Sequence, residues 1–165
     1  MAIVFPSGTL SAPTKVLQVV QTTKTDVFST TSGSWTSVTG MSVSITPSST
    51  SSKILVLCNA SIGQGHYAYH RVVRGSTALL VGASGTYVCT YGGYSGGASE
   101  GEHYYGSWTH PIAYLDSPST TASTTYTYQM RTNGSGHAVL VNRGNANDGN
   151  SAFGASSITL LEIGS

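Results

Sequence analysis

From Lys15 onward, apolar and polar residues follow the two-residue period of extended strands. Over no helix-length stretch do apolar residues recur at the three-four spacing of an amphipathic helix. The clearest alternation is in the run 41–46, where Met41, Val43 and Ile45 face one side and the intervening Ser and Thr residues face the other. This pattern predicts an all-β protein whose strands have an apolar inner face and a hydroxyl-rich outer face.

Turn residues such as Ser32-Gly33 divide this pattern into about ten short strands, a spacing typical of a sandwich or barrel. The predicted strands are 16–22, 26–30, 34–38, 41–45, 53–62, 67–73, 78–81, 108–115, 124–131, 138–142 and 157–163. The more apolar segment 53–62 is expected to be a central strand. We therefore predict a jelly-roll-like antiparallel β-sandwich over residues 15–165, with the strand order left open.

Three parts of the chain lack this two-residue period. Residues 1–14 contain Pro6, Gly8 and Pro13 among small polar residues, which predicts an extended N-terminal arm that docks on a neighbour. The segment 82–106 is dominated by Gly, Tyr and Ser, and 144–154 is a shorter Asn/Gly loop. A loop of some twenty residues inside a domain is usually functional or disordered.

Charged residues make up only 8% of the chain, against roughly a quarter in an ordinary domain. The formal net charge is +1, and the seven Lys and Arg residues are scattered. Because binding to nucleic acid, an anionic membrane or an acidic substrate needs clustered basic residues, we expect none of these partners. The longest apolar run, 54–58, is strand-sized and the chain begins without a charged leader, so we expect no membrane insertion and no signal peptide.

The cysteines and histidines give little support for redox or metal chemistry. Cys58 lies in the apolar run 54–58 and is expected to be a buried free thiol, with a disulfide to Cys89 as the alternative. No carboxylate or Cys pair stands at ligand spacing from the histidines, so we expect no metal and no other cofactor. The alternative is a metal site at a symmetry axis, formed by one histidine from each of three protomers. The five histidines are His66, His70, His103, His110 and His137.

Catalysis is also unexpected in this chain. A Gly-x-Ser-x-Gly nucleophile elbow needs a strand-to-helix turn, and no helix is predicted. Glu100 and Glu102 are the nearest approach to a carboxylate pair for glycoside cleavage, but acids in a Gly-rich segment are more often solvated. Asp116, which precedes Ser117-Pro118, is interpreted as the cap of a turn. We predict that the protein is not an enzyme.

Tyrosine is the better indicator of function. Tyr supplies a large contact area at low entropic cost, and Gly and Ser let a loop adapt, which together is the composition of recognition loops. Aromatic faces also stack on sugar rings. The alternative is that the tyrosine rings pack between protomers. Tyr126 and Tyr128 alternate with polar residues and are expected to pack in the core or between protomers. Trp35 and Trp108 also lie in strand-like segments and are expected to be core anchors. The candidate surface-recognition residues are Tyr67, Tyr69, Tyr87, Tyr91, Tyr94, His103, Tyr104 and Tyr105.

Four blocks of the sequence carry a family resemblance. They are KVLQVV at 15–20, ITPSSTSSKILV at 45–56, YLDSPSTT at 114–121 and SITLLEI at 157–163. Together these blocks resemble small β-rich virion proteins of tailed bacteriophages, particularly phages of aquatic bacteria and cyanobacteria. The resemblance runs nearly the whole chain, but nothing in it corresponds to 82–106.

The resemblance implies a jelly-roll domain that assembles as a homotrimer on the virion surface after synthesis in the host cytoplasm. Within the family, such domains are capsid decoration or cement proteins, or receptor-binding tips of tail fibres. We expect a non-catalytic decoration protein that binds the major capsid protein, or another virion protein, through residues 1–14. The alternative is a tail-fibre tip that recognises a host surface glycan through the tyrosine-rich region.

Overall fold

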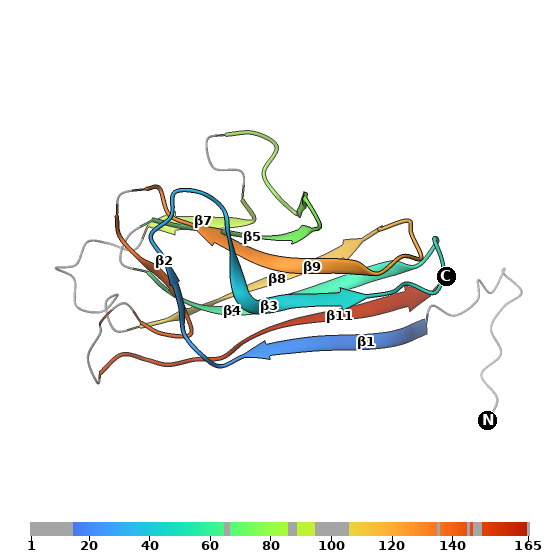
Figure 1. Ribbon diagram of the computed structural model, residues 1–165, viewed down its shortest axis with the longest axis horizontal. Helices are drawn as coiled ribbons and strands as arrows, with labels where there is room; N and C mark the ends of the chain where they lie inside the picture. Colours follow the sequence, from blue (N-terminus) through green and yellow to red (C-terminus); the bar gives the residue numbers. More distant parts are fainter. Residues whose placement is uncertain are drawn as a thin grey trace, which may run out of the picture.

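The computed structural model describes residues 15–64, 67–85, 89–94, 106–134, 136–144, 146 and 150–164. The described residues form strands and contain no helix, and the strands make two antiparallel sheets packed face to face (Figure 1). The predicted β-sandwich is therefore confirmed, while the expected arm at 1–14 lies outside the described residues. The strands are β1 (Lys15–Lys24), β2 (Phe28–Thr30), β3 (Thr36–Ile45), β4 (Lys53–Gln64), β5 (Tyr67–Arg74), β6 (Thr77–Leu79), β7 (Tyr91–Tyr94), β8 (Trp108–Asp116), β9 (Thr124–Arg131), β10 (Val139–Val141) and β11 (Ser156–Gly164).

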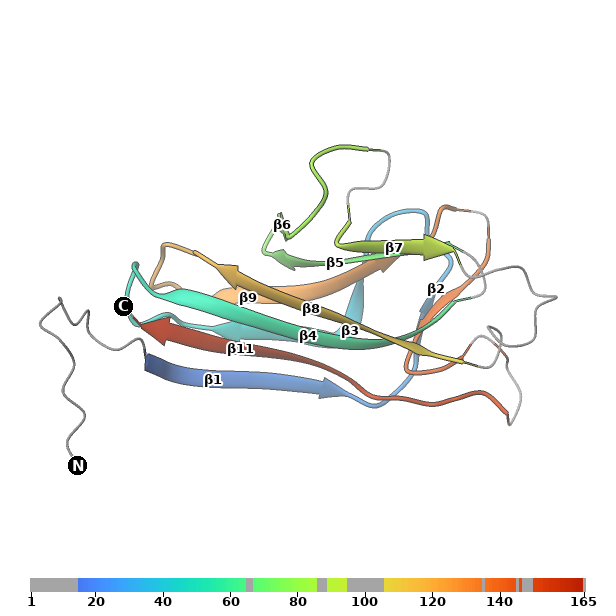
Figure 2. The same ribbon diagram turned by 180° about the vertical axis from the view of Figure 1, so that it is seen from behind.

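The first sheet contains four long strands in the order β1-β11-β4-β8 (Figure 2). One edge of β4 pairs with β11 and then, near its end, with β10, which in turn pairs with β2. The second sheet has the order β3-β9-β5, and both β6 and β7 pair with β5. Successive long strands alternate between the sheets, so segments distant in sequence become neighbours. As predicted, β4 is a central strand.

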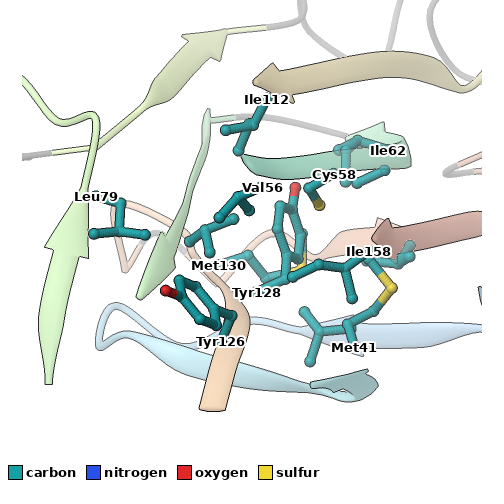
Figure 3. Close-up of a cluster of buried hydrophobic side chains, with 14 of the residues drawn as sticks. Met41, Val56, Cys58, Ile62, Leu79, Ile112, Tyr126, Tyr128, Met130 and Ile158 are labelled. Carbon is teal, nitrogen blue, oxygen red and sulfur yellow. The ribbon is translucent and has the colours of Figure 1, made fainter. Parts of the chain in front are cut away.

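The core lies between the two sheets and is formed by alternate residues of the long strands. Tyr126 and Tyr128 of β9 are fully buried there, as expected, among aliphatic and sulfur-containing side chains (Figure 3). Cys58 is also buried and, like Cys89, is a free thiol, and burial raises the pKa of Cys58 to about 12. The core side chains labelled in Figure 3 are Met41, Val56, Cys58, Ile62, Leu79, Ile112, Tyr126, Tyr128, Met130 and Ile158.

Most predicted strand ends lie within two residues of the observed ends, but two strand assignments differ from the sequence prediction. The segments 34–38 and 41–45 belong to one strand, β3, because Gly40 has a φ of +83° and the register with β9 shifts between Ser37 and Ser42. Such a bulge lets a strand continue through a glycine that would otherwise indicate a turn. Strand β7 was not predicted, because its two central glycines lower strand propensity.

The prediction for Trp108 was wrong, since its side chain is 44% exposed. It is the first residue of β8, which forms an edge of the first sheet, and the strand end leaves it at the surface. Trp35 lies just before β3, where its half-buried ring packs beneath the guanidinium of Arg71 rather than in the core cluster.

Candidate functional site

A row of apolar side chains crosses the outer face of the first sheet through all four long strands. Val19 of β1 pairs with Leu161 of β11, Leu161 pairs with Leu55 of β4, and Leu55 pairs with Leu115 of β8. These residues face away from the core because their neighbours along β4 and β11 are the buried ones. Val19 is 56% exposed and Leu115 is 53% exposed. We call these four residues the apolar row.

The patch continues beyond the apolar row toward the beginning of β1. Val16 and Leu17 are exposed there, and Ile163 is partly exposed on the neighbouring strand β11. Leu57 is partly exposed on the other side of the apolar row, where β4 pairs with Thr159. Single exposed hydrophobic residues are normal, but a contiguous patch marks an interaction surface. Val19 and Leu115 are about half exposed, and covering these two side chains would contribute roughly 1.5–3 kcal/mol by transfer free energies. The outer face of the first sheet is therefore suited to packing against another protein surface.

The opposite outer face, on the second sheet, is polar and neutral over most of its area. The hydroxyl of Ser42 donates to Thr127 Oγ1 at 3.0 Å, and Ser44 and Thr125 share a hydrogen bond of 2.7 Å. These pairs join β3 to β9 across the face and satisfy the side chains locally. The two outer faces thus differ in chemistry, and only the first presents a continuous apolar surface among the described residues.

Tyr67 and Tyr69 lie on this second face, since both alternate with the buried residues of β5. Their rings are parallel, with centroids 6.3 Å apart and an interplanar angle of 1°. Tyr69 pairs with Gly92 of β7, and a Cβ at Gly92 would lie 2.6 Å from the Tyr69 ring. Because Gly92 has no side chain, the Tyr69 ring can lie against strand β7 at this position.

The remaining predicted recognition residues do not join this pair in the described structure. Tyr91 lies at the rim between the sheets and contacts two histidines instead. Tyr94 belongs to β7, but its side chain lies outside the described part of the chain. The other four lie outside the described residues: Tyr87, His103, Tyr104 and Tyr105.

Sequence reasoning missed the basic residues of this face. Arg71 and Arg131 are brought to one indole ring, with their Cζ atoms 4.1 Å and 5.9 Å from the ring centroid of Trp35. The two-residue period of β5 places Tyr67, Tyr69 and Arg71 on one side of the strand. This period could have identified Arg71 as a residue of the same face as the two tyrosines. Arg131 joins them only because β9 pairs with β5, which the sequence does not reveal.

His70 and His110 connect the two sheets at the edge where β8 faces β5. His70 Nε2 and His110 Nδ1 share a hydrogen bond of 2.7 Å, and His70 is almost fully buried. Tyr91 stacks on His70 with ring centroids 5.5 Å apart, while Tyr128 contacts His70 from the core side at 5.7 Å. Burial, with a smaller contribution from His110, lowers the pKa of His70 to about 3. Burial also lowers the pKa of His110, so the pair is neutral near pH 7.

This pair makes stability sensitive to acid. Because the pKa of His70 falls from 6.5 to about 3 on folding, protonation favours the unfolded chain. The stabilisation is complete above pH 6.5 and is lost progressively as the pH falls toward 3. Between pH 7 and 4.5, we expect His70 alone to lower the free energy of unfolding by about 2 kcal/mol.

Urea unfolding at both pH values measures this effect. The variant His70→Phe is expected to have a smaller pH dependence, whatever its absolute stability. Glu162 does not contribute strongly in this window, because its pKa changes from 4.5 to about 2. A pH dependence equal to that of the unmodified protein would show that His70 is not the titrating group.

The described carboxylates occupy structural positions. Burial acts to raise the pKa of Glu162, but hydrogen bonds from Ser48 and Gln18 outweigh it and lower the pKa to about 2. Ser48 belongs to the turn after β3, so Glu162 attaches this turn to β11. Asp116 accepts bonds from Arg74 and Tyr126. Two of the sequence blocks that carry the phage resemblance, 45–56 and 157–163, thus touch each other through Glu162.

The histidines predicted as alternative metal ligands are only partly brought together. His137 lies exposed before β10, and His66 and His103 lie outside the described residues. Within the described ranges, no three His, Cys, Asp or Glu side chains form a group that could hold a metal ion. The same ranges contain no helix that could cross a membrane. Comparison with protein-family models finds no match to this chain, and comparison with curated proteins finds none.

Proposed function

We propose that this chain is a non-catalytic structural protein of a tailed-bacteriophage virion, a homotrimeric decoration protein on the capsid surface. The observation that carries the proposal is the apolar row on the outer face of the first sheet. Contiguous exposed apolar patches mark surfaces that contact other molecules, and assembly would cover this one. In this proposal, neighbouring protomers cover the row, and residues 1–14 contact the major capsid protein or another virion protein.

The sequence of β4 supports coverage of both faces of the first sheet. The run 54–58 is continuously apolar, which is typical of a strand buried on both sides. Among the described residues of one chain, only the inner side is covered, by the second sheet, and Leu55 and Leu57 remain partly exposed on the outer side. A second protein surface over the first sheet would account for the apolar residues at both positions.

The charge distribution agrees with an interface between protomers. Interface centres are depleted of charged residues, and the apolar row contains none. Lys15 and Lys53 lie at the end of the patch rather than within it. The resemblance to trimeric virion proteins favours three copies as the assembly.

The strand order supports the jelly-roll assignment within this family. A jelly roll places eight strands in two sheets through two Greek keys. Here β1-β11-β4-β8 forms one sheet and β3-β9-β5-β7 the other, with successive long strands alternating between them. This arrangement brings the first and last strands, β1 and β11, side by side, which places the beginning and end of the domain next to each other.

Charged substitutions in the apolar row test the interface. We expect the double variant Val19→Lys, Leu115→Lys to be a monomer at micromolar concentration, because assembly would bury two unpaired charges. The matched control, Ser42→Lys, introduces a charge on the opposite outer face and is expected to remain a trimer. Light scattering after size-exclusion chromatography measures the mass of each variant. A trimeric double variant, or a monomeric control, would contradict the proposed interface.

The alternative function, a receptor-binding tip of a tail fibre, is favoured by the parallel pair Tyr67 and Tyr69 on the outer face of the second sheet. The number of copies in purified virions distinguishes the two functions. A decoration protein is present in hundreds of copies, whereas a fibre tip is present in a few dozen. Quantitative mass spectrometry of washed particles measures this number, and absence of the protein from the particles would contradict both.

A further inference from the structure

We propose that a cavity at one end of the sandwich binds the phosphate or sulfate group of a sugar ester, with Arg74 as the anion-binding residue. The cavity has a volume of about 460 Å³ and lies between the turn after β5 and the segment that joins β8 to β9. No residue of the apolar row lines it, so this site is separate from the proposed assembly surface. Its lining includes Arg74, Gly75, Pro118, Thr120, Ser123 and Thr124.

Arg74 lies at the end of the core, between the two sheets. It occupies an inward-facing position of β5, in phase with the buried residues Ala68 and Val72. Its Nη1 donates to the two carboxylate oxygens of Asp116 at 3.2 Å and 3.0 Å. The side chain is 25% exposed and lines the cavity. The buried carboxylate therefore holds one nitrogen of the guanidinium, and the exposed part of the side chain is available to a ligand.

The cavity contains hydrogen-bond donors that the described part of the chain leaves unused. Arg74 Nη1 makes both bonds to Asp116, while Nε and Nη2 donate to no described residue. The Thr120 hydroxyl accepts from the backbone N–H of Ala122 at 3.0 Å and keeps its own proton for donation. The Ser123 hydroxyl has no hydrogen bond to any residue that the structure describes. A ligand that supplies acceptor oxygens would satisfy these groups.

The chemistry of these donors fits a tetrahedral oxyanion. A guanidinium binds phosphate through two parallel, charge-assisted hydrogen bonds, and the hydroxyl groups can donate to the remaining oxygens. Among the described residues, no carboxylate lines the cavity. Asp116 is buried, and its oxygens accept from Arg74 and Tyr126. It therefore orients the guanidinium and does not compete for its remaining donors.

The size and lining of the cavity favour an ester rather than a free inorganic anion. A volume of about 460 Å³ lies in the range of small-molecule sites. The hydroxyls of Thr120 and Ser123 suit a hydroxyl-rich group such as a sugar. Ser119, between two lining residues, has a φ of +52°, and such strained backbone is concentrated at binding sites. Nucleic acid fits less well, because it is held by many basic residues.

Titration of the unmodified full chain with glucose 6-phosphate and with glucose 6-sulfate tests the proposal, and glucose is the matched neutral ligand. Amide chemical shifts in NMR spectra report both the affinity and the place of binding. We expect at least one ester to bind at least about tenfold more tightly than glucose, because only an ester accepts charge-assisted bonds from Arg74. The shifts should centre on Gly75, Thr120 and Ser123, and the more tightly bound ester identifies the group as phosphate or sulfate.

Three results would overturn the proposal: no saturable binding of either ester at millimolar concentration, esters bound no more tightly than glucose, or shifts centred outside the cavity. None of them bears on the proposed assembly, because no residue of the apolar row lines the cavity.

Substitutions test the residues responsible. Ser123→Glu leaves Arg74 and Asp116 in place but adds a negative charge, so we expect it to weaken ester binding at least about tenfold. The matched control Ser29→Glu adds the same charge on β2, at the other end of the first sheet, and is expected to leave the affinity unchanged. Arg74→Lys retains the charge beside Asp116 but loses the forked geometry, and is also expected to weaken binding.

Thermal unfolding verifies that each variant is folded, and Ser123→Glu decides the test even if Arg74→Lys is unstable. Ester binding by Ser123→Glu as tight as by Ser29→Glu would show that the cavity is not the binding site, whatever oligomer the protein forms.

Discussion

Replacing Asp116 by alanine is expected to lower the free energy of unfolding by about 3–5 kcal/mol, because it breaks a buried charge network. Asp116 is the last residue of β8 in the first sheet, and its carboxylate accepts from Arg74 of β5 and from the Tyr126 hydroxyl of β9. Burial raises the pKa of Tyr126, so this hydroxyl stays protonated and remains a donor. The carboxylate therefore links the two sheets at one end of the core.

The double variant Asp116→Ala, Tyr126→Phe separates the two contributions to this loss. It removes the hydroxyl that would otherwise stay buried without a partner, so we expect it to recover part of the lost stability. The control Ser117→Ala removes an exposed hydroxyl from the residue next to Asp116, and surface substitutions of this kind usually change stability little. Urea unfolding measures all three variants. An Asp116→Ala loss no larger than that of the control would contradict the structural role of the network.

Replacing Gly63 by alanine is expected to cost about 3 kcal/mol or more. Gly63 lies near the end of β4, and a Cβ there would lie 1.9 Å from the carbonyl oxygen of Arg143. The obstructing atom belongs to the backbone, so relief requires the chain after β10 to move rather than one side chain to rotate. This movement would disturb the pairing of Gly63 with Leu140.

Gly82 provides the matched control for this substitution. A Cβ at Gly82 would meet nothing within 4 Å, so Gly82→Ala is expected to change stability by less than about 0.5 kcal/mol. Thermal or urea unfolding of the two variants gives the comparison. Equal stabilities for Gly63→Ala and Gly82→Ala would show that the chain after β10 does not lie against β4 as described.

The positions of most strands could be predicted because alternation is a local signal. The predicted segment 124–131 coincides with β9, whose inward residues Tyr126, Tyr128 and Met130 are all fully buried. Where glycine interrupts the pattern, the prediction failed, as in β7 and at the bulge in β3. A glycine indicates a turn, a bulge or a close contact equally well, and the choice depends on distant residues.

The candidate sites depend on register, which is not local. Val19, Leu55, Leu115 and Leu161 are far apart in sequence, and only their strand pairing forms one apolar row. The prediction for Asp116 failed for the same kind of reason. It was expected to cap a turn, but its carboxylate accepts hydrogen bonds from the side chains of Arg74 and Tyr126 on other strands. Alternation predicts which way a side chain faces, but not what it meets.

Sedimentation equilibrium of the unmodified protein at micromolar concentration tests the central claim most directly. One chain has a mass of 17.0 kDa, and the proposed assembly through the outer face of the first sheet contains three chains. We expect a single species of three times the chain mass that persists on dilution through the micromolar range. A stable species with the mass of one chain would contradict the claim that other copies cover the apolar row.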